Sequence, residues 1–561
     1  MSVVTVRWAG GAIRVPKGTL LSDALRMGGL HLDTPCGGNG RCGKCAVRVS
    51  PEDSVHLPGA RLADGYRLAC KFAVDTDVTV SIPALPVGMT AGLQGNWIES
   101  VRATEGRREA PGMASGGAGG PVCGLATGQA TDQTAGSAVD PAPRPGAGPV
   151  ASLTDARTTD RVAGLAIDLG TTSISVSLID LRTGEELASS VRPNPQAAYG
   201  ADIMSRLLYA TARPRNNGKL RRLALDSIAE AFSDLLKSSG VRRKEVLASV
   251  LVGNTAMHHL ALGLSVKDLS VHPYTAATLK PREADILGIP HVYAPPVVES
   301  FVGSDLVAAA LATGIASLPT TSLLIDVGTN SEVLLCRNGK LYACSAPAGP
   351  AFEGGEISQG MLALPGAVYE VLPEFELSVV GGGQPTGICG SGILDAIVAL
   401  LRAGILDRSG LMHRRETFSD RIIHETDGSL KFALAPDLFL TQKDIRAVQL
   451  AKGALRCAVD ALLHEAGVAS ATPVELDAVY LAGAFGTSLR VASVLEAGLV
   501  PPIAPEKVRQ VGNAAIVGAK AILLSDSVKA EAERLAKAIQ HVDLASIEGF
   551  QERFLSSLSF E

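Results

Sequence analysis

Apolar and polar residues alternate near the start of the chain, which is the pattern of a half-buried strand. The alternation runs through residues 4–8, is interrupted by a Gly-Gly pair, and resumes at residues 13–15. This pattern predicts a β-hairpin. Residues 19–27 then place their leucines and an alanine on one helical face, which predicts a short helix. With two further predicted strands, in "CAVRV" and "VTVSIP", residues 1–95 are predicted to form a small strand-rich domain.

Two similar apolar segments occur in the second part of the chain. They are "LAIDLGTTSISVSLID", which begins at Leu165, and "LLIDVGTNSEVLL", which begins at Leu323. Each predicts a strand, an Asp-x-Gly-Thr turn and a second strand. One unit that recurs once at a domain-sized separation indicates two similar lobes rather than a solenoid. Residues 161–561 are therefore predicted to form a two-lobed α/β body.

The segment between these parts, residues 96–160, has a different composition. Residues 111–150 contain 10 Gly, 8 Ala and 6 Pro and no aromatic residue. Such a segment buries too little apolar area to offset the entropy lost on ordering, so it is predicted to be a flexible linker. A structured Gly/Ala-rich insertion is the alternative.

Bulk composition narrows the class of protein. The net charge of −5 does not favour nucleic acid as a partner, and the apolar stretches are too short and interrupted to span a membrane. The N-terminus lacks a signal-peptide apolar region, which predicts a cytoplasmic protein. In a reducing compartment, nine cysteines in 561 residues indicate metal or redox chemistry where they cluster.

Such a cluster lies in "PCGGNGRCGKC". The stretch resembles a phosphate-binding P-loop, but Cys45 follows Lys44 where a P-loop needs Ser or Thr. The spacing C-x5-C-x2-C-x24-C instead predicts the ligands of a 2Fe-2S cluster, with one residue more in the first gap than plant ferredoxins have. Structural zinc, which usually takes two short Cys pairs, is the weaker alternative. The domain resembles a β-grasp 2Fe-2S ferredoxin of the hydroxylase type, with these ligands: Cys36, Cys42, Cys45 and Cys70.

The two Asp-x-Gly-Thr turns are predicted to bind phosphate. The glycines permit tight turns, and hydroxyl and backbone N–H groups suit phosphate oxygens. Asp168 and Asp326 are the predicted catalytic pair, each facing Mg²⁺ through water. The other phosphate-binding candidates are Gly170, Thr171, Thr172, Gly328, Thr329 and Asn330.

Two later segments complete the predicted nucleotide site. In Val479–Leu489 a strand ends in small residues that suit an approaching adenosine: Gly483, Ala484 and Gly486. In "VGNAAIVGAKAIL" small residues predict close helix packing. This order resembles the actin-like ATPase superfamily of acetate and sugar kinases, hexokinase and heat-shock chaperones. A doubly wound α/β domain without nucleotide is the alternative.

Four other motifs have less transparent chemistry. The Cys344–Gly360 loop is a candidate docking segment for a partner, and "GICGSGILDAI" predicts a helix start that suits phosphate or a partner. His258 and His259 suit metal less well than a core or capping role. "NPQAAYGADIMSR", residues 194–206, is interpreted as a surface patch.

Nearly the whole chain outside the linker resembles the reductive activators of corrinoid enzymes. The strings that carry this resemblance include "CGGNGRCGKC", "DLGTTS", "YGADIMSR", "GNTAMHH", "DVGTNSE", "AGPAFEGG", "GICGSG" and "LAGAFG". The resemblance implies ATP-dependent transfer of one electron from the 2Fe-2S cluster to the inactive Co(II) corrinoid protein of a methyltransferase system, which restores Co(I). It also implies a low-potential electron donor. One departure is the linker, where some relatives carry an ordered small domain.

Three rival hypotheses remain at this point. Activators of 2-hydroxyacyl-CoA dehydratases also couple an actin-like ATPase to electron transfer, but they resemble small dimers without a ferredoxin domain. A redox-sensing regulatory module would bind partners without appreciable ATP turnover. A molybdenum hydroxylase subunit would need a second Cys-rich cluster domain, which the sequence lacks.

Overall fold

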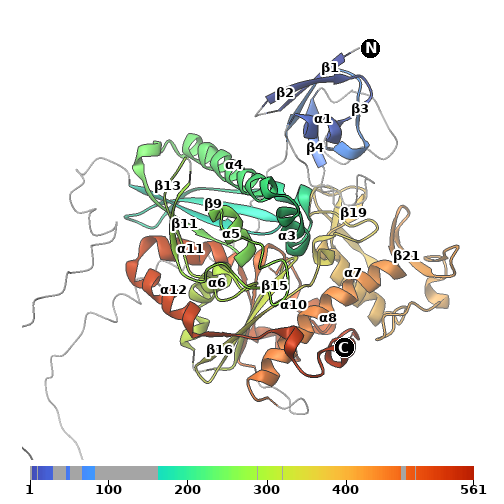
Figure 1. Ribbon diagram of the computed structural model, residues 1–561. Helices are drawn as coiled ribbons and strands as arrows, with labels where there is room; N and C mark the ends of the chain where they lie inside the picture. The colour runs from blue at the N-terminus through green and yellow to red at the C-terminus, as the bar shows by residue number, and fades with distance from the viewer. Residues whose placement is uncertain are drawn as a thin grey trace, which may run out of the picture.

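The computed structural model describes most of the chain in its second part and portions of the first (Figure 1). The described residues are 3–8, 11–28, 46–50, 66–81, 162–286, 288–318, 320–468, 476–486 and 488–560. The predicted linker, residues 96–160, lies outside these residues. Within the described part of the chain, no helix is long and apolar enough to cross a bilayer.

The N-terminal domain is a five-stranded mixed sheet of order β2-β1-β7-β4-β5, packed against one helix. The predicted hairpin is confirmed, because β1 and β2 pair antiparallel from Val3–Pro16 to Trp8–Gly11. β1 also pairs in parallel with β7, which gives the mixed order of a β-grasp sheet. The elements are β1 Val3–Trp8, β2 Gly11–Pro16, β3 Thr19–Leu20, α1 Leu21–Met27, β4 Ala46–Ser50, β5 Tyr66–Leu68, η2 Ala69–Lys71, β6 Ala73–Val74 and β7 Val78–Ser81.

The first lobe of the body is a six-stranded sheet of order β10-β9-β8-β11-β13-β12. Apolar residues of the strands and helices fill its outer core, and the long helix α4 lies along this face (Figure 1). The elements are β8 Ala163–Leu169, β9 Ser173–Asp180, β10 Glu186–Pro193, α3 Ile203–Ala212, α4 Pro214–Ser239, β11 Val246–Val252, α5 Thr255–Leu262, β12 Arg282–Ile286 and β13 Ile289–Ala294.

The second lobe repeats this arrangement. Its six-stranded sheet has the order β24-β23-β14-β15-β16-β25, so a meander of three antiparallel strands again meets two parallel strands. The predicted two-lobed α/β body is confirmed. The sheet strands are β14 Ser322–Asp326, β15 Ser331–Arg337, β16 Lys340–Ala346, β23 Ala478–Ala482, β24 Val508–Gly512 and β25 Ile539–His541.

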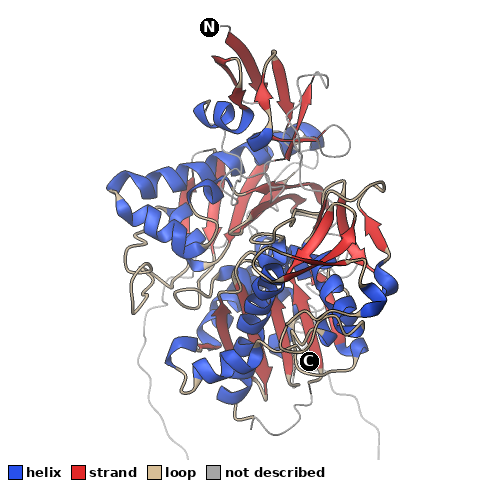
Figure 2. Cartoon of the chain, turned by 90° about the vertical axis from the view of Figure 1, so that its right-hand side faces the viewer, coloured by secondary structure: helices blue, strands red, loops and turns tan. Residues whose placement is uncertain are grey.

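The lobes meet through a layer of helices between the two sheets (Figure 2). The glycine of α11 at position 518 lies directly against the backbone of α6 at Ala308, where a Cβ atom would have no room. This close approach confirms the predicted helix packing. The helices of this layer are α6 Ser304–Thr313, α11 Ala514–Leu524 and α12 Asp526–Ala538.

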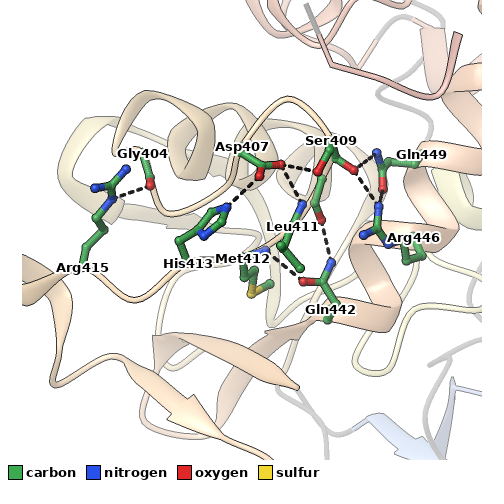
Figure 3. A network of polar contacts seen from close by, with 11 residues as sticks. Gly404, Asp407, Ser409, Leu411, Met412, His413, Arg415, Gln442, Arg446 and Gln449 are labelled. Atoms are coloured by element: carbon green, nitrogen blue, oxygen red, sulfur yellow. Dashed lines mark hydrogen bonds and ion pairs between the residues drawn. The ribbon is translucent and has the colours of Figure 1, made fainter. Parts of the chain in front are cut away.

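The outer side of the second lobe carries two small sheets and the longer helices α7 and α8. A polar network fixes the loop between these helices, with Asp407 accepting from Ser409, Leu411 and His413 (Figure 3). Gln449 donates to the Ser409 carbonyl from α8. The remaining strands and α-helices are β17 Ala367–Val371, β18 Leu377–Val379, β19 Gly387–Ile388, α7 Gly390–Arg402, β20 Ile422–His424, β21 Leu430–Ala435, β22 Leu438–Thr441, α8 Gln442–Glu465, α9 Gly483–Gly486, α10 Val491–Glu496 and α13 Phe550–Ser557.

The N-terminal domain packs on the second lobe beside β19 (Figure 1). Its apolar core is continuous with four buried residues of the body, so one hydrophobic cluster crosses between the two parts. The four residues are Met361, Leu364, Ala367 and Cys389.

Candidate functional site

The two predicted phosphate turns face each other across a cleft between the lobes. The hydroxyl oxygens of Thr172 and Thr329 lie 3.0 Å apart, although they come from different sheets. The turns meet because each connects the first two strands of its lobe, and the lobes repeat one topology. The structure therefore brings these predicted residues to one site: Asp168, Gly170, Thr171, Thr172, Asp326, Gly328, Thr329, Asn330 and Gly483 line the cleft.

Buried amides hold the first turn in shape. Asn194 donates from Nδ2 to the Gly170 carbonyl at 2.8 Å, and its backbone N–H donates to the Thr172 carbonyl at 2.8 Å. Asn254 donates to the Thr171 hydroxyl at 3.0 Å. The side chain of Asn254 also caps α5 by accepting from the Met257 N–H. The turn is thus anchored to the core of its lobe from two sides.

The second turn is held mainly by a loop rather than by the core. Glu353 accepts from the backbone N–H of Thr329 at 3.1 Å and from its hydroxyl at 2.8 Å. The same carboxylate accepts from the hydroxyl of Thr172 at 2.9 Å. Backbone contacts join the turn to its neighbours: Gly349 N–H donates to the Thr329 carbonyl, and Val327 N–H donates to the Ala482 carbonyl.

The predicted adenosine turn lies beside the second phosphate turn. Gly483 has φ +87°, and a Cβ atom there would lie 2.5 Å from Asp326 Oδ1, so both the backbone conformation and the available space require glycine. The strand β23 ends at Ala482, as predicted, and the short helix α9 (Gly483–Gly486) follows it directly. Phe485 lines the cleft and stacks on Phe352 with ring centroids 5.4 Å apart.

Four carboxyl groups share the floor of the cleft: Asp168, Asp305, Asp326 and Glu332. Burial raises the pKa of Asp168 to about 6, against which a 2.7 Å hydrogen bond from Asn513 acts. Burial, and secondarily the Asp168 charge, raises the pKa of Asp326 to about 7. Burial and the neighbouring carboxylates also raise the pKa of Asp305 and Glu332. Such a cluster of acidic groups favours a bound cation when ionised.

The residues of the cleft fit a nucleotide with its divalent cation. The side-chain nitrogen of Asn330 is buried without a hydrogen-bond partner in the described part of the chain, and it stands on the second phosphate turn. An unpaired buried donor of this kind is costly unless a ligand oxygen accepts from it. Among the described residues no three acidic, His or Cys side chains lie close enough to hold a metal ion by themselves. Water and phosphate oxygens would therefore complete the coordination of Mg²⁺, which suits its preference for retained water.

One prediction about this region was wrong. Residues 194–206 were interpreted as a surface patch, but Asn194, Gln196 and Arg206 are almost completely buried. They connect α3 to the first phosphate turn: Arg206 donates to Gln196, whose backbone N–H donates to Asn194 at 3.0 Å. The sequence predicted exposure because these side chains are polar. They are buried because each donates to a backbone carbonyl whose position the sequence does not show: Asn194 to Gly170, Gln196 to Leu220 and Arg206 to Gly200.

The remaining motifs have simpler positions. His258 and His259 lie buried in α5, as the core interpretation predicted, and burial lowers the pKa of both rings, that of His258 to about 3. The helix α7 begins at Gly390, as predicted, and its first turn lines the cleft. Within the Cys344–Gly360 loop, Phe352 and Glu353 line the same cleft.

Of the four predicted cluster ligands, the structure describes Cys70. It is buried in the short helix η2, which packs against α1. Cys36, Cys42 and Cys45 lie outside the described residues, as does the side chain of Ala484. The assignment of these ligands stays a prediction.

Sequence reasoning missed several residues of the site. Asn254 and Asn513 were present in quoted motifs, and an Asn directly before a helical pattern is an N-cap signal that marks a helix start. Asp305 stands in the first turn of α6, and nothing in its local sequence relates it to either phosphate turn. Glu353 lies in the Cys344–Gly360 loop, and nothing in the sequence of that loop indicates a contact with the phosphate turns.

Comparisons with known proteins agree with this architecture. Residues 320–561 match the family described as the C-terminal domain of RACo, the ASKHA domain. Residues 163–317 match the RACo middle region, and residues 6–75 match the 2Fe-2S iron-sulfur cluster binding domain.

Individual relatives extend the agreement over most of the chain. The corrinoid activation enzyme RamQ of Eubacterium limosum is 31% identical over 416 residues, which cover 70% of this chain and 69% of RamQ. The Co(II) methylated amine-specific corrinoid protein reductase of Methanosarcina barkeri is 26% identical over 439 residues, covering 70% of this chain and 76% of that reductase. A solved structure of a reductive activator for corrinoid, iron-sulfur protein superimposes with a TM-score of 0.65 at 30% identity, covering 99% of this chain and 98% of the activator.

Proposed function

The chain belongs to the reductive activators of corrinoid proteins, and we propose that it transfers one electron to the inactive Co(II) corrinoid of a methyltransferase protein, restoring Co(I) at the expense of ATP. The electron comes from a low-potential donor by way of a 2Fe-2S cluster. The cobalt is the substrate of this reaction: it gains one electron, and the reduced cluster loses one. We place the reaction in a reducing cytoplasm, which suits clustered thiolates.

Cys36, Cys42, Cys45 and Cys70 are the proposed ligands of the cluster. A bound 2Fe-2S cluster supplies a one-electron carrier whose potential the surrounding protein adjusts. The chain's own contribution is the position of the domain that carries these cysteines. The core of that domain is continuous with Met361 and Cys389, which also line the nucleotide cleft.

The cleft carries the proposed ATP site. Thr171, Thr172, Thr329 and Asn330 would donate to phosphate oxygens, and Asp168 and Asp326 would hold Mg²⁺ through water. Asp305 is a further acidic group for that ion: burial, and after it the charges of Asp168 and Asp326, raise the pKa of Asp305. Gly483, Ala484 and Gly486 would lie against the adenosine.

One observation carries the proposal. Two phosphate turns from separate lobes meet hydroxyl to hydroxyl in a body onto which a ferredoxin-like domain packs. An ATPase and an electron carrier in one chain are useful together where ATP binding or hydrolysis makes an unfavourable electron transfer possible. One electron over 59 mV corresponds to about a tenfold change in equilibrium constant.

The test is an anaerobic visible spectrum of a corrinoid protein in its Co(II) form. This protein, a low-potential reductant and Mg-ATP are added, with a matched sample that lacks ATP. We expect the Co(I) band to grow only with ATP, and we expect Cys45→Ser and Asp168→Ala each to abolish it. Reduction that proceeds equally without ATP, or that survives Asp168→Ala, would remove ATP from the proposal. Absence of reduction with corrinoid proteins of several methyltransferase systems would favour the regulatory alternative.

A further inference from the structure

A carboxylate occupies the place between the two phosphate turns. Glu353 accepts from the Thr172 hydroxyl, the Thr329 hydroxyl and the Thr329 backbone N–H at 2.8–3.1 Å. These are the groups that suit the oxygens of a phosphate. A carboxylate presents the same kind of anionic oxygen acceptor, so Glu353 and a nucleotide phosphate compete for one set of donors.

The neighbouring residue reaches into the adenosine side of the cleft. Phe352, buried in the short helix η8 (Ala351–Glu353), stacks on Phe485 with the ring planes 17° apart. The cleft has a volume of about 260 Å³. Phe352 and Glu353 thus line the two parts of the cleft in which adenosine and phosphate would lie.

The segment that carries these two side chains is tightly folded up to Met361. Gly354 has φ +78°, and a Cβ atom there would lie 2.9 Å from the backbone of Met361. Gly355 N–H donates to the Pro350 carbonyl at 2.8 Å, and Met361 N–H donates to the Ile388 carbonyl at 2.9 Å. Since the two ends of this loop touch each other, a shift of the backbone at Glu353 and Gly354 would also move the backbone near residue 361.

The same segment continues to the face on which the N-terminal domain packs. Met361, Leu362 and Ala363 line the cleft. Met361 and Leu364 belong to the apolar cluster shared with the core of the N-terminal domain, and Leu362 and Ala363 pack against it. Residues 350–367 therefore contact the phosphate turns at one end and the electron-carrying domain at the other.

We propose that Glu353 holds the phosphate site in the nucleotide-free protein, and that ATP displaces it and thereby loosens the packing of the N-terminal domain on residues 361–367. This inference rests on the proposed function, because it takes ATP as the ligand of the cleft and the N-terminal domain as the electron carrier. It adds the route by which nucleotide binding would release that domain to reach the cobalt.

The first test compares nucleotide affinity in the full-length protein. Glu353→Gln keeps the size of the side chain but removes the charge that competes with phosphate, and we expect it to bind Mg-ATP about tenfold more tightly. Glu356→Gln is the matched control, because Glu356 is an exposed acid of the same loop, and its affinity should equal that of the wild type. Unchanged affinity in Glu353→Gln together with lost hydrolysis would overturn the proposal and make Glu353 a catalytic group.

The second test measures amide hydrogen exchange by mass spectrometry with and without Mg-ATP. Exchange in residues 361–371 and 66–74 should rise when the wild type binds ATP, since these segments form or adjoin the shared apolar cluster. Glu353→Gln should show part of this rise without nucleotide, and Glu356→Gln should not. Exchange that stays the same in both segments while ATP binds would overturn the inference alone. A wild type that does not bind Mg-ATP at all would overturn the proposed function as well.

Discussion

The two phosphate turns have nearly the same sequence but different supports. "DLGTTS" and "DVGTNS" both connect the first two strands of a lobe. The first turn is anchored by buried amides, with Asn194 on its Gly170 carbonyl and Asn254 on its Thr171 hydroxyl. The second turn is bound through its Thr329 by Glu353, a residue of a loop that also lines the cleft, and through its Gly328 by the Ser331 hydroxyl of the turn itself. Similar sequence has thus placed equivalent donors at one site without giving them equivalent surroundings.

Because their supports differ, the two turns are expected to respond differently when a nucleotide binds. A turn held by core amides cannot move without breaking buried hydrogen bonds, which is costly. A turn held by a loop carboxylate can exchange that carboxylate for a phosphate and keep its donors satisfied. We interpret the backbone of the first turn as a fixed anchor for the nucleotide, since only its Thr172 hydroxyl shares Glu353. The second turn exchanges the partner of both its Thr329 hydroxyl and its Thr329 backbone N–H when nucleotide binds.

The largest effect on activity is expected when the carboxylate of either turn is removed, which also tests whether the two turns are equally necessary. We expect Asp168→Asn and Asp326→Asn each to reduce the ATP-dependent rate of corrinoid reduction by about 100-fold or more, because each removes a charge that favours the cation at the developing phosphate charge. The measurement is the initial rate of Co(I) formation at saturating reductant.

Asp285→Asn serves as the control for these variants, because Asp285 is an exposed acid on β12 of the first lobe. Its rate should match that of the wild type. If Asp326→Asn kept most of the rate while Asp168→Asn lost it, the two turns would not act as one site.

The support of the first turn can be broken from a distance at Arg206. This side chain is completely buried and donates to the Gly200 carbonyl at 2.8 Å and towards Gln196. Arg206→Ala should lower the unfolding free energy by about 3 kcal/mol, the scale for truncating a large buried side chain. It should also weaken Mg-ATP binding, because the chain of contacts from Arg206 through Asn194 shapes the turn.

Thermal unfolding followed by circular dichroism checks this prediction. A decrease of about 3–4 °C is expected for the body of roughly 400 residues, since the unfolding entropy is about 2.1 cal/mol/K per residue. Arg215→Ala is the matched control, since Arg215 is exposed on α4, and it should change neither the midpoint nor ATP affinity. A loss of stability with unchanged affinity for ATP would show that the network supports the lobe but not the turn.

These two turns also show what sequence can and cannot predict. The strand-turn-strand pattern predicted both turns, and its repetition predicted two lobes, because both depend on local apolar patterning and on glycine at tight turns. The partners of the turns could not be predicted in the same way. Glu353 and Asn194 contact the turns only because of the tertiary fold, and no local sequence pattern around either residue predicts these contacts.

Burial of polar residues was the hardest property to read. Arg206 and Gln196 are residue types that usually lie on the surface. They are buried here because backbone carbonyls of the fold accept hydrogen bonds from them. Asp305 was missed for a related reason, since its relation to Asp168 depends on how α6 packs between the lobes.

The finest comparison of the turns is the pH dependence of nucleotide binding. Burial raises the pKa of Asp168 to about 6 and that of Asp326 to about 7, the latter without the Asn513 hydrogen bond that stabilises ionised Asp168. Below these values the carboxyl groups carry protons and do not attract Mg²⁺. As the pH rises through these two pKa values, the ionised carboxylates attract Mg²⁺ but repel ATP that has no bound cation. Affinity for Mg-ATP should therefore increase from pH 6 to pH 8, whereas affinity for ATP in the presence of a chelator should decrease.

The terminal phosphate of ATP titrates near pH 6, so the series is best measured between about pH 6.5 and 8.5, where the charge of Asp326 changes most. The measured quantity is the affinity for Mg-ATP divided by the affinity for ATP with a chelator, both from calorimetry of the full-length protein. This ratio should rise about threefold to tenfold over this pH range, since one pKa unit corresponds to 1.36 kcal/mol. A flat ratio would mean that Asp326 is already ionised at pH 6.5 and that the two acids do not differ in the way their surroundings indicate.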